Sequence, residues 1–256
     1  MTPEEIQASE VLQGDCLELM KDIPDGSVDM ILADLPYGTT ACKWDTIIPF
    51  EPLWKQYKRI IKPNGAIVLT ASQPFTSALV MSNPKMFKYG WVWQKSPTGF
   101  LNAKKMPMKS VEDVLVFYNK QPPYNPQGLI RIDKVVNNHK TKSIKSSIGL
   151  STHNGGRLSG KYVQRYTNYP TQVLSYPNLK GLHPTQKPVA LFEYLIKTYT
   201  NEGDLVLDNV AGSGTTGVAC QNTNRNFILM EKEPEYVEVM KKRLELNKEL
   251  RNEQAS

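Results

Sequence analysis

The feature that most constrains this chain is an alternation of short apolar runs with helix-like stretches, interrupted once by a long basic segment. Val28–Ala33 is the clearest run, because it is mostly apolar and stops at the turn-forming residues Asp34-Leu-Pro-Tyr-Gly38. Apolar runs of strand length are typical of strands that are buried on both faces. The alternation therefore predicts an α/β fold with a doubly wound, mostly parallel sheet.

The same pattern gives the expected elements and domains. Seven strands are expected, five before the basic segment and two after it: Glu10–Gln13, Val28–Ala33, Ala66–Ala71, Tyr89–Gln94, Asp113–Tyr118, Asp204–Asp208 and Asn226–Met230. Helices are expected over Cys16–Lys21, Pro52–Ile61, Val189–Tyr199, Thr215–Gln221 and Glu235–Leu250. Residues 1–119 and 183–256 are expected to form one domain, and residues 120–182 a loop-rich, irregular insert.

Composition excludes several classes of protein. A hydrophobic share of 40% and a charged share of 22% are typical of a globular chain. No apolar run approaches the roughly 20 residues that span a bilayer, and the N-terminal residues do not resemble a signal peptide. The three cysteines and three histidines lack the spacing of a disulfide framework or a metal site. We therefore expect a cytoplasmic protein without a metal.

Charge is distributed unevenly along the chain. Residues 85–182 hold 16 Lys and Arg against 3 Asp and Glu, a net charge of +13, whereas the other residues together carry −7. A basic segment on a mildly acidic body indicates a protein that binds a polyanion such as nucleic acid. A solvated, lysine-rich surface would explain the same charges when they are considered alone.

A glycine-rich turn follows the strand that ends at Asp208. Gly212, Gly214 and Gly217 satisfy the G-x-G-x-x-G pattern of dinucleotide sites, in which glycines allow the backbone to approach a ligand closely. Asp208 suits an amino or cationic group, and Glu231 at the end of the next strand can chelate ribose hydroxyls. These features favour a nucleoside cofactor, with a turn used only for helix–strand packing as the alternative.

A second candidate site is Asp34-Leu-Pro-Tyr37, directly after a predicted buried strand. The amino group of a nucleobase is a poor nucleophile because its lone pair is delocalised into the ring. A carboxylate at Asp34 and the main-chain carbonyl of Leu35 or Pro36 could accept both amino protons and make the nitrogen nucleophilic. Pro36 stiffens the turn, and Tyr37 can stack on a base drawn out of a duplex.

Four segments together resemble the S-adenosylmethionine-dependent amino-methyltransferases of DNA. Asp34-Leu-Pro-Tyr37 resembles their D-P-P-Y motif, and Asp208–Thr216 is similar to their D-P-F-A-G-S-G-T-T loop. His183–Pro188 matches their H-P-T-Q-K-P segment, and Gly14-Asp-Cys16 their G-D-C segment. The catalytic motif precedes the cofactor loop, which is the circular permutation of the β class. In that class the intervening stretch reads the target sequence.

The resemblance implies a fold, a cofactor and a set of site residues. It implies a class I methyltransferase fold in which residues 1–119 supply the catalytic part, 120–182 the target-recognition insert and 183–256 the cofactor-binding part. The catalytic residues it implies are Asp34, Pro36 and Tyr37. The cofactor S-adenosylmethionine is expected to contact Asp15, Cys16, Asp34, Thr185, Lys187, Asp208, Ala211, Gly212, Ser213, Gly214, Thr215, Glu231 and Lys232.

The resemblance also implies a reaction on double-stranded DNA with base flipping. Asp34 stands where cytosine-N4 enzymes more often have Ser, so adenine N6 is the expected target. Phosphate contacts are expected from Lys104, Lys105, Lys109, Lys134, Lys140, Lys142, Lys145, Arg157, Lys161 and Arg165. Tyr162, Tyr166, Tyr169 and Tyr176 are expected to pack a small core of the insert.

Two departures from the family pattern are expected to be tolerated. Leu35 replaces the first proline of D-P-P-Y, which makes the turn less rigid while leaving the acceptor Asp34 in place. Asn209 and Val210 replace Pro-Phe in the cofactor loop, so an aromatic contact to the cofactor is lost or supplied by another residue. Neither change removes a group that the chemistry requires.

Several alternatives stay open at this point. A cytosine-N4 methyltransferase differs from the leading hypothesis only in its target base. The G-x-G-x-x-G pattern also allows a nicotinamide-dependent oxidoreductase, although that reading leaves Asp34–Tyr37 unexplained. A non-catalytic nucleic-acid-binding module and an RNA substrate are further readings. A homodimer and a cognate restriction enzyme, as in restriction-modification systems, are compatible partners.

Overall fold

The computed structural model describes residues 10–40, 45–138, 160–178 and 186–255. It contains two compact units. The first joins Met1–Asn125 to Thr171–Ser256, and the second is Pro126–Pro170. The second unit is therefore shorter than the insert 120–182 expected from the sequence, because residues at both ends of that insert pack with the first unit.

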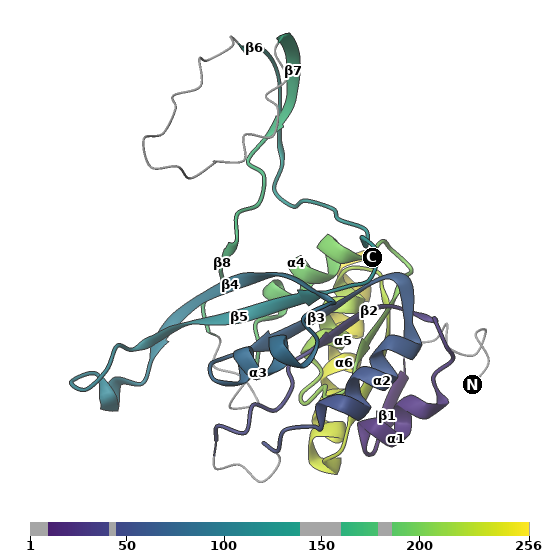
Figure 1. The fold of residues 1–256 in the computed structure, drawn as a ribbon. Coiled ribbons are helices and arrows are strands. Elements are labelled where there is room, and N and C mark those ends of the chain that lie inside the picture. The colour runs from purple at the N-terminus through teal and green to yellow at the C-terminus, as the bar shows by residue number, and fades with distance from the viewer. Residues whose placement is uncertain (1–9, 41–44, 139–159, 179–185, 256) are drawn as a thin grey trace. The chain divides into compact units, whose positions relative to one another are not determined.

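The first unit is built on an eight-stranded sheet (Figure 1). In spatial order the strands are β1 (Glu10–Gln13), β10 (Asn226–Glu231), β9 (Leu205–Asp208), β2 (Val28–Ala33), β3 (Ile61–Ala71), β5 (Lys109–Phe117), β4 (Phe87–Thr98) and β8 (Val173–Ser175). Strand β5 is antiparallel to β3 and β4, and every other neighbouring pair is parallel. The predicted α/β fold with a mostly parallel sheet is confirmed.

All seven predicted strands are present, and the differences lie at their ends. Strand β3 already begins at Ile61, and β4 runs beyond Gln94 to Thr98. Strand β8 was not predicted from the sequence. It has three residues, of which only Leu174 is buried, so it offers no periodic signal.

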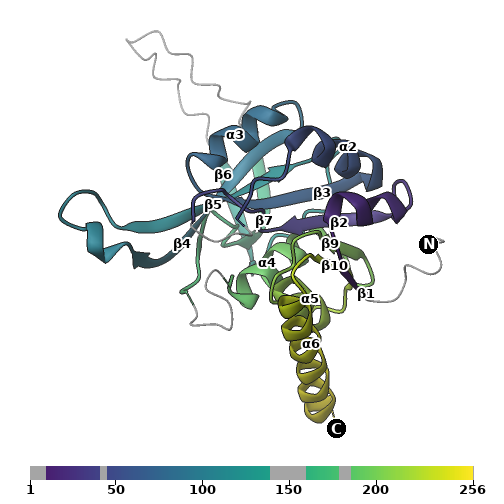
Figure 2. The ribbon, with the colours of Figure 1, turned by 90° about the horizontal axis from the view of Figure 1, so that it is seen from below.

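Helices cover both faces of the sheet (Figure 2). One face carries α1 (Cys16–Leu19), the 3-10 helix η2 (Met20–Asp22), α2 (Phe50–Ile60) and α3 (Phe75–Ser82). The other carries α4 (Val189–Tyr199), α5 (Thr215–Asn222) and α6 (Pro234–Ala255). Within β2, Ile31 and Ala33 pack against the first set, whereas Met30 and Leu32 pack against the second. Successive side chains of a strand point to opposite faces, so an apolar run such as β2 supplies both cores.

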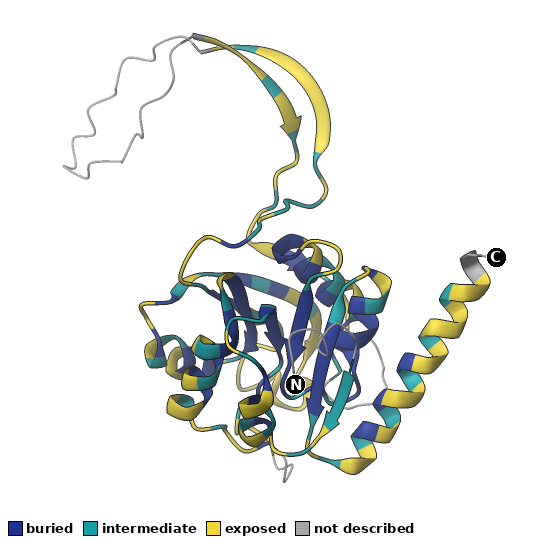
Figure 3. Ribbon diagram, turned by 90° about the vertical axis from the view of Figure 1, so that its right-hand side faces the viewer, coloured by how far each residue is buried: buried dark blue, intermediate teal, exposed yellow. Residues whose placement is uncertain are grey.

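The helices differ from prediction in two places. Helix α3 was missed, because the residues Phe75–Ser82 carry no charge that marks a solvent face and hence no clear helical period. Helix α6 extends to Ala255, five residues past its expected end. Figure 3 shows buried strands at the centre and a largely exposed C-terminal part of α6. Among the described residues, no helix combines the length and apolar character needed to cross a membrane.

The second unit contains a β-ribbon where the sequence predicted irregular structure. Strands β6 (Ile130–Asn138) and β7 (Gly160–Thr167) pair antiparallel, with Val136 opposite Tyr162. The ribbon was missed because apolar and charged residues are mixed on both of its faces, so no alternation stands out.

The expected tyrosine core is also wrong. Tyr162, Tyr166 and Tyr169 are 46%, 39% and 59% exposed. Tyr176 belongs to the first unit, where its ring lies 6.4 Å from that of Tyr194.

The chain segments on either side of the second unit are hydrogen-bonded to the sheet or to helix α4 of the first unit. The backbone N–H of Asn125 donates to the Thr198 carbonyl at 2.8 Å, and its side-chain amide donates to the Thr200 carbonyl at 3.0 Å. On the other flank, the Gln172 carbonyl accepts from the backbone N–H of Val92 at 2.8 Å, and β8 pairs with β4. Residues 120–125 and 171–178 thus belong structurally to the sheet unit.

Candidate active site

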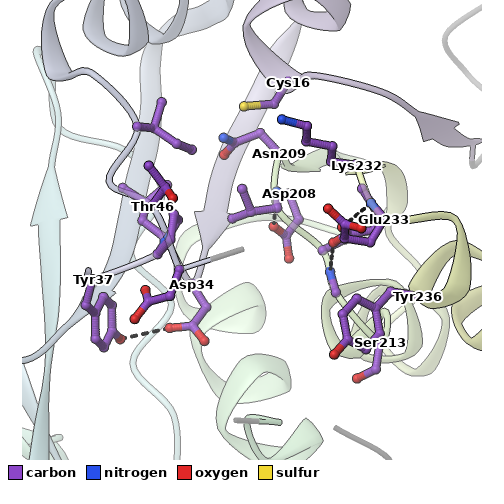
Figure 4. A pocket seen from close by; sticks show the side chains of 18 of the residues that line it. Cys16, Asp34, Tyr37, Thr46, Asp208, Asn209, Ser213, Lys232, Glu233 and Tyr236 are labelled. Atoms are coloured by element: carbon purple, nitrogen blue, oxygen red, sulfur yellow. Dashed lines mark hydrogen bonds between the residues drawn. The ribbon is translucent and has the colours of Figure 1, made fainter. Parts of the chain in front are cut away.

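A cavity of about 380 Å³ opens at the carboxyl ends of β1, β2, β9 and β10 (Figure 4). Ligands of open α/β sheets bind at this edge, where connections leave in opposite directions from neighbouring strands. The cavity is lined by residues at the end of each of the four strands or just after it, including Asp15, Asp34, Asp208 and Glu231. Its volume lies within the range of about 300–1,000 Å³ that is usual for small-molecule sites.

Asp34, at the end of β2, is held by three side-chain donors. Its Oδ1 accepts from the Tyr37 hydroxyl at 2.8 Å and from the Thr70 hydroxyl. Its Oδ2 accepts from Lys187 Nζ at 2.7 Å. Thr70 lies on β3 beside β2, so the central strands of the sheet fix the carboxylate.

Lys187 stands between two carboxylates and is 7% exposed. Its Nζ lies 2.7 Å from Asp34 and 3.4 Å from Glu112 Oε2 on β5. Burial alone would lower the pKa of Lys187, but the charges of Asp34 and Glu112 outweigh burial and raise it. Glu112 in turn pairs with Lys95 on β4. The predicted catalytic and cofactor segments are thereby joined by one chain of alternating charges.

Tyr37 contributes a ring and a neutral hydroxyl. The ring stacks on Phe75 of α3, with centroids 5.2 Å apart and planes inclined by 25°. Burial, reinforced by the charge of Asp34, raises the pKa of Tyr37 well above its usual value. Its hydroxyl therefore keeps its proton and can donate to Asp34.

The loop after Tyr37 is pinned by Asp45, a residue that the sequence analysis missed. Its carboxylate accepts from the backbone N–H groups of Gly38, Thr39 and Thr40 at 2.7–2.9 Å. Burial opposes ionisation of Asp45, but these bonds and one from the Thr40 hydroxyl outweigh burial and lower its pKa. Asp45 therefore fixes the wall of the cavity that continues from the catalytic turn.

The two glycines of the cofactor loop have different functions. Gly212 lines the cavity at φ +52°, and a Cβ added to it would meet no atom within 4 Å. Its N–H donates to Glu231 Oε2 at 2.8 Å. Gly214 does not line the cavity; a Cβ there would lie 2.5 Å from Met240 Cγ on α6. Gly214 thus permits close packing between the loop and α6, which the sequence reading had attributed to cofactor approach.

Asp208, at the end of β9, is 3% exposed. It accepts from the Thr216 hydroxyl and from the backbone N–H of Val210, the latter at 3.1 Å. Burial raises the pKa of Asp208 to about 7, and these two hydrogen bonds offset only part of the effect. Ionisation of the buried Asp208 is costly without a partner. A cationic or amino group in the cavity would therefore stabilise its charged form.

The G-D-C segment forms the opposite wall of the cavity. Asp15 caps α1, accepting from the backbone N–H of Leu17 at 2.9 Å. Cys16 is buried, and burial raises the pKa of its thiol, which disfavours a nucleophilic role. Asn209 is 1% exposed; its Oδ1 accepts from the Tyr57 hydroxyl at 2.6 Å, and its Nδ2 has no partner among the described residues.

The structure brings most of the predicted site residues to one cavity. The lining includes Asp15, Cys16, Asp34, Pro36, Tyr37, Lys187, Asp208, Ala211, Gly212, Ser213, Thr215, Glu231 and Lys232. Thr185 lies outside the described residues. The sequence reading missed Asp45, Thr70, Glu112 and Lys95, which no motif marks. It also left Asn209 out of the site, although it had marked that residue as a departure from the family's loop.

The predicted DNA contacts fall into two groups. Lys104 and Lys105 are exposed on the connection between β4 and β5 of the first unit, and Lys109 is exposed at the start of β5. Lys134, Lys161 and Arg165 are exposed on the ribbon of the second unit. Lys140, Lys142, Lys145 and Arg157 lie outside the described residues. Phosphate binding by either group remains a prediction.

Comparison with known sequences supports the reading of the motifs. Residues 28–242 match the sequence model of a DNA methylase family. A DNA adenine methyltransferase of Escherichia coli (strain K12), YhdJ, is 30% identical over 258 residues, covering 94% of this chain and 84% of that protein. A type II methyltransferase of Haemophilus parainfluenzae, M.HpaI, is 27% identical over 241 residues, covering 90% and 72%.

Solved structures agree with the fold. The crystal structure of the M1.HpyAVI–SAM complex is 28% identical and has a TM-score of 0.61, covering 92% of this chain and 99% of the other. The cytosine-N4-specific PvuII DNA methyltransferase has a TM-score of 0.64 at 17% identity, covering 91% and 86%, and shows the fold alone. With the motifs gathered at one cavity and the family model matching most of its length, the chain belongs to the N6/N4 family of DNA methylases.

Proposed function

We propose that the chain transfers a methyl group from S-adenosylmethionine to the N6 atom of an adenine flipped out of duplex DNA. The observation that carries the proposal is the Asp34 carboxylate, fixed at the edge of the cofactor cavity with one oxygen only partly used. The adenine preference is further supported by Asp at position 34 and by a relative, 30% identical, that is named as a DNA adenine methyltransferase.

The hydrogen bonds of Asp34 indicate which oxygen meets the target. A carboxylate oxygen has two lone pairs. Oδ1 accepts from both Tyr37 and Thr70, whereas Oδ2 accepts only from Lys187 among the described residues. Oδ2 therefore keeps one lone pair for an amino proton of the base. The main-chain carbonyl of Leu35 or Pro36 accepts a hydrogen bond from the second N–H, which concentrates the nitrogen lone pair for attack.

The cavity fits S-adenosylmethionine in size and in chemistry. Glu231 accepts two backbone N–H groups but retains lone pairs for ribose hydroxyls. Gly212 leaves space where a side chain would stand. Tyr236 lines the same cavity and is the candidate for the aromatic contact that Val210 cannot provide. When bound, the cofactor supplies an electrophilic methyl group on a sulfonium.

The reaction requires little from the enzyme beyond positioning and charge. Oδ2 of Asp34 orients the amino group and stabilises the positive charge that develops on nitrogen as the N–CH3 bond forms and the methyl–sulfur bond breaks. The methylated nitrogen then releases one proton to solvent, and S-adenosylhomocysteine is the leaving product. Lys187 and the Tyr37 hydroxyl hold the carboxylate in place for this task. No metal or nucleophilic side chain has a part in the proposal.

The proposal is tested with plasmid DNA from a host without DNA methylases. We expect the wild-type chain and S-adenosylmethionine to yield N6-methyldeoxyadenosine in digests analysed by mass spectrometry, and N4-methyldeoxycytidine would overturn the adenine assignment. Asp34→Ala should abolish methylation, while titration calorimetry shows cofactor affinity within a few-fold of wild type. Long-read sequencing of the product would give the sequence context.

Partners other than DNA remain proposals with their own tests. A homodimer predicts twice the chain mass in sedimentation equilibrium. A cognate restriction enzyme predicts that methylated plasmid resists a nuclease encoded beside the chain. The cytoplasmic location expected from composition is likewise still a prediction.

A further inference from the structure

Strands β4 and β5 continue beyond the rest of the sheet as a two-stranded arm (Figures 1 and 2). Pairing runs out to Thr98 and Lys109, although β5 meets β3 only up to Asp113. The tip of the arm is a 3-10 helix, η3 (Phe100–Asn102). The sequence predicted strands only over Tyr89–Gln94 and Asp113–Tyr118, so it did not predict the arm.

The tip exposes large apolar side chains. Leu101 is 98% exposed and Phe100 is 80% exposed, the highest values for large apolar residues in the described parts of the chain. Met106 and Met108 add exposures of 56% and 37%. Isolated exposed apolar residues are ordinary, but a contiguous group on a protruding tip indicates a surface that is covered by a partner.

The turn that presents these side chains is internally hydrogen-bonded. The Gly99 carbonyl accepts from the Asn102 N–H at 2.9 Å, and the Phe100 carbonyl accepts from the Ala103 N–H at 3.0 Å. The Asn102 carbonyl then accepts from the N–H groups of Lys105 and Met106 at 2.8 and 3.0 Å. Gly99 adopts φ +89°, which makes the tight entry into η3 possible. The apolar pair is thus held outward by a regular backbone.

Positive charge surrounds the tip. Residues 95–109 contain four lysines and no acidic residue. Lys95 is paired with Glu112, but Lys104, Lys105 and Lys109 are exposed and form no ion pair with the described residues. An apolar tip flanked by unpaired cations matches a partner with negative charge outside and flat apolar surfaces inside, which is the chemistry of duplex DNA.

The base of the arm adjoins the catalytic carboxylate. Glu112 and Trp93 are paired residues of β5 and β4. Glu112 lies 3.4 Å from Lys187, whose Nζ also lies 5.9 Å from the centre of the Trp93 ring. Lys109 precedes Glu112 by three residues and lies farther out along the arm, about 10 Å along a strand. The arm therefore begins at the group that holds Asp34 and ends beyond it.

We propose that Phe100 and Leu101 form an apolar wedge that enters the base stack of DNA beside the flipped base. Lys104, Lys105 and Lys109 hold the adjoining phosphates. The inference rests on the proposed function and adds a DNA contact to it. A second copy of the chain fits the tip less well, because an isologous contact would place these lysines against their own equivalents. An anionic membrane fits the charge but not the proximity of the tip to a DNA methylase site.

The wedge is tested by its effect on DNA geometry in closed-circular plasmid, where the recognition sequence need not be known. Plasmid saturated with protein and S-adenosylhomocysteine is relaxed by a topoisomerase, and its linking number is then measured. Side chains inserted between base pairs unstack and kink the duplex. We expect the wild-type chain to change the linking number and Phe100→Ala/Leu101→Ala to produce less than half of that change at equal occupancy. The double variant should also bind DNA about ten- to hundredfold more weakly, with an unchanged salt dependence.

Matched variants distinguish insertion of the wedge from a general loss of apolar surface or of positive charge. Leu246→Ala/Leu250→Ala removes two exposed apolar side chains from α6 and should behave as wild type. Lys104→Ala/Lys105→Ala/Lys109→Ala should instead flatten the salt dependence while the linking-number change at saturation persists. The wedge would be overturned if the Phe100→Ala/Leu101→Ala variant changed the linking number as much as the wild type. It would also be overturned if the only defect of this variant were a loss of self-association in sedimentation, or a loss of binding to phosphatidylserine vesicles.

The outcome is independent of the test of the proposed function. Unwinding is measured without methyl transfer, and N6-methyldeoxyadenosine is assayed in parallel. A wild-type chain that unwinds plasmid but never methylates it would contradict the proposed function alone. A wild-type chain that methylates DNA, with a Phe100/Leu101 variant that unwinds it equally, would contradict the wedge alone.

Discussion

Lys187 Nζ lies 2.7 Å from Asp34 Oδ2, although 153 residues separate the two positions. The contact joins the catalytic turn after β2 to the segment that leads into α4, on opposite sides of the second unit in the sequence. Because Lys187 is buried, neither charge of the pair is freely solvated. The ion pair therefore couples correct folding of the first unit to the position and charge of the Asp34 carboxylate.

Replacing Lys187 by Met should impair stability and catalysis together. The change leaves Asp34 without its cationic partner and should lower the free energy of unfolding by about 3 kcal/mol, the lower end for a broken buried pair, since Asp34 keeps some exposure. Urea denaturation and methylation assays check both effects. Lys232→Met is the control: Lys232 is exposed at the same cavity and has no ion pair with described residues, so its variant should unfold like wild type. Equal stability of the two variants would contradict the coupling.

Gly212→Ala and Gly214→Ala should fail in different assays. At position 214, φ is +79° and the new Cβ meets Met240, so stability should fall by about 2 kcal/mol or more. At position 212 φ is +52°, so a smaller loss of stability is expected, but the new methyl group meets no protein atom and enters the cavity. S-adenosylmethionine should therefore bind more weakly in calorimetry. Met240 is fully buried, so Met240→Ala is itself destabilising, but the double variant Gly214→Ala/Met240→Ala should lose less stability than the sum of the two single variants. Normal cofactor binding by Gly212→Ala would show that the turn serves packing only.

Asp208 should make the free protein less stable as the pH rises towards neutrality. Its pKa is raised from 3.8 to about 7 on folding, so between these values the folded chain holds a proton that the unfolded chain has released. The stabilisation is complete below the unfolded pKa and is lost as the pH rises through the folded one. Asp208→Asn should remove a slope of up to about 1.4 kcal/mol per pH unit. Urea denaturation from pH 5 to 8 measures it, and parallel curves for both proteins would contradict the assignment.

The basic residues of the second unit should make DNA binding sensitive to salt. Removing Lys134, Lys161 and Arg165 together should reduce the slope of log K against log salt by about 0.9 for each lost phosphate contact. Lys140→Ala/Lys142→Ala/Lys145→Ala should act likewise. Cofactor affinity should not change.

Three exposed lysines of α6 provide the matched control. Lys241→Ala/Lys242→Ala/Lys248→Ala removes the same charge and should keep the wild-type slope. A slope that falls only in the Lys104/Lys105/Lys109 variant would place the phosphate contacts on the arm and not in the second unit.

The sequence was most informative where local pattern and tertiary environment agree. Strands such as β2 and β9 are buried on both faces, so their composition alone indicates their place in the sheet. The turns after them contain glycine, proline and acidic residues. The effect of these residues on the backbone and on a ligand depends mainly on their own position in the chain. The cavity could therefore be predicted from residues that lie within a few positions of a strand end.

The missed features depend on contacts between distant segments. Glu112 is an unremarkable strand residue until β5 brings it 3.4 Å from Lys187. The function of Gly214 depends on Met240, which lies on a helix 26 residues later. In helix α3 and the ribbon β6–β7, apolar and polar residue types are not divided regularly between two faces, and that division is the only signal that a periodic sequence pattern can provide.

The fastening of both flanks of the second unit has a consequence for how such a chain can diversify. Asn125 is bound to the end of α4, and Gln172 and β8 are bound to β4, so the chain leaves and re-enters the sheet unit at fixed points. Residues 126–170 can therefore lengthen, shorten or be grafted from another chain between these anchors. If these residues select the target sequence, as the sequence predicts, a change confined to them would alter the choice of DNA site and leave the Asp34–Lys187 pair and the cofactor cavity unchanged.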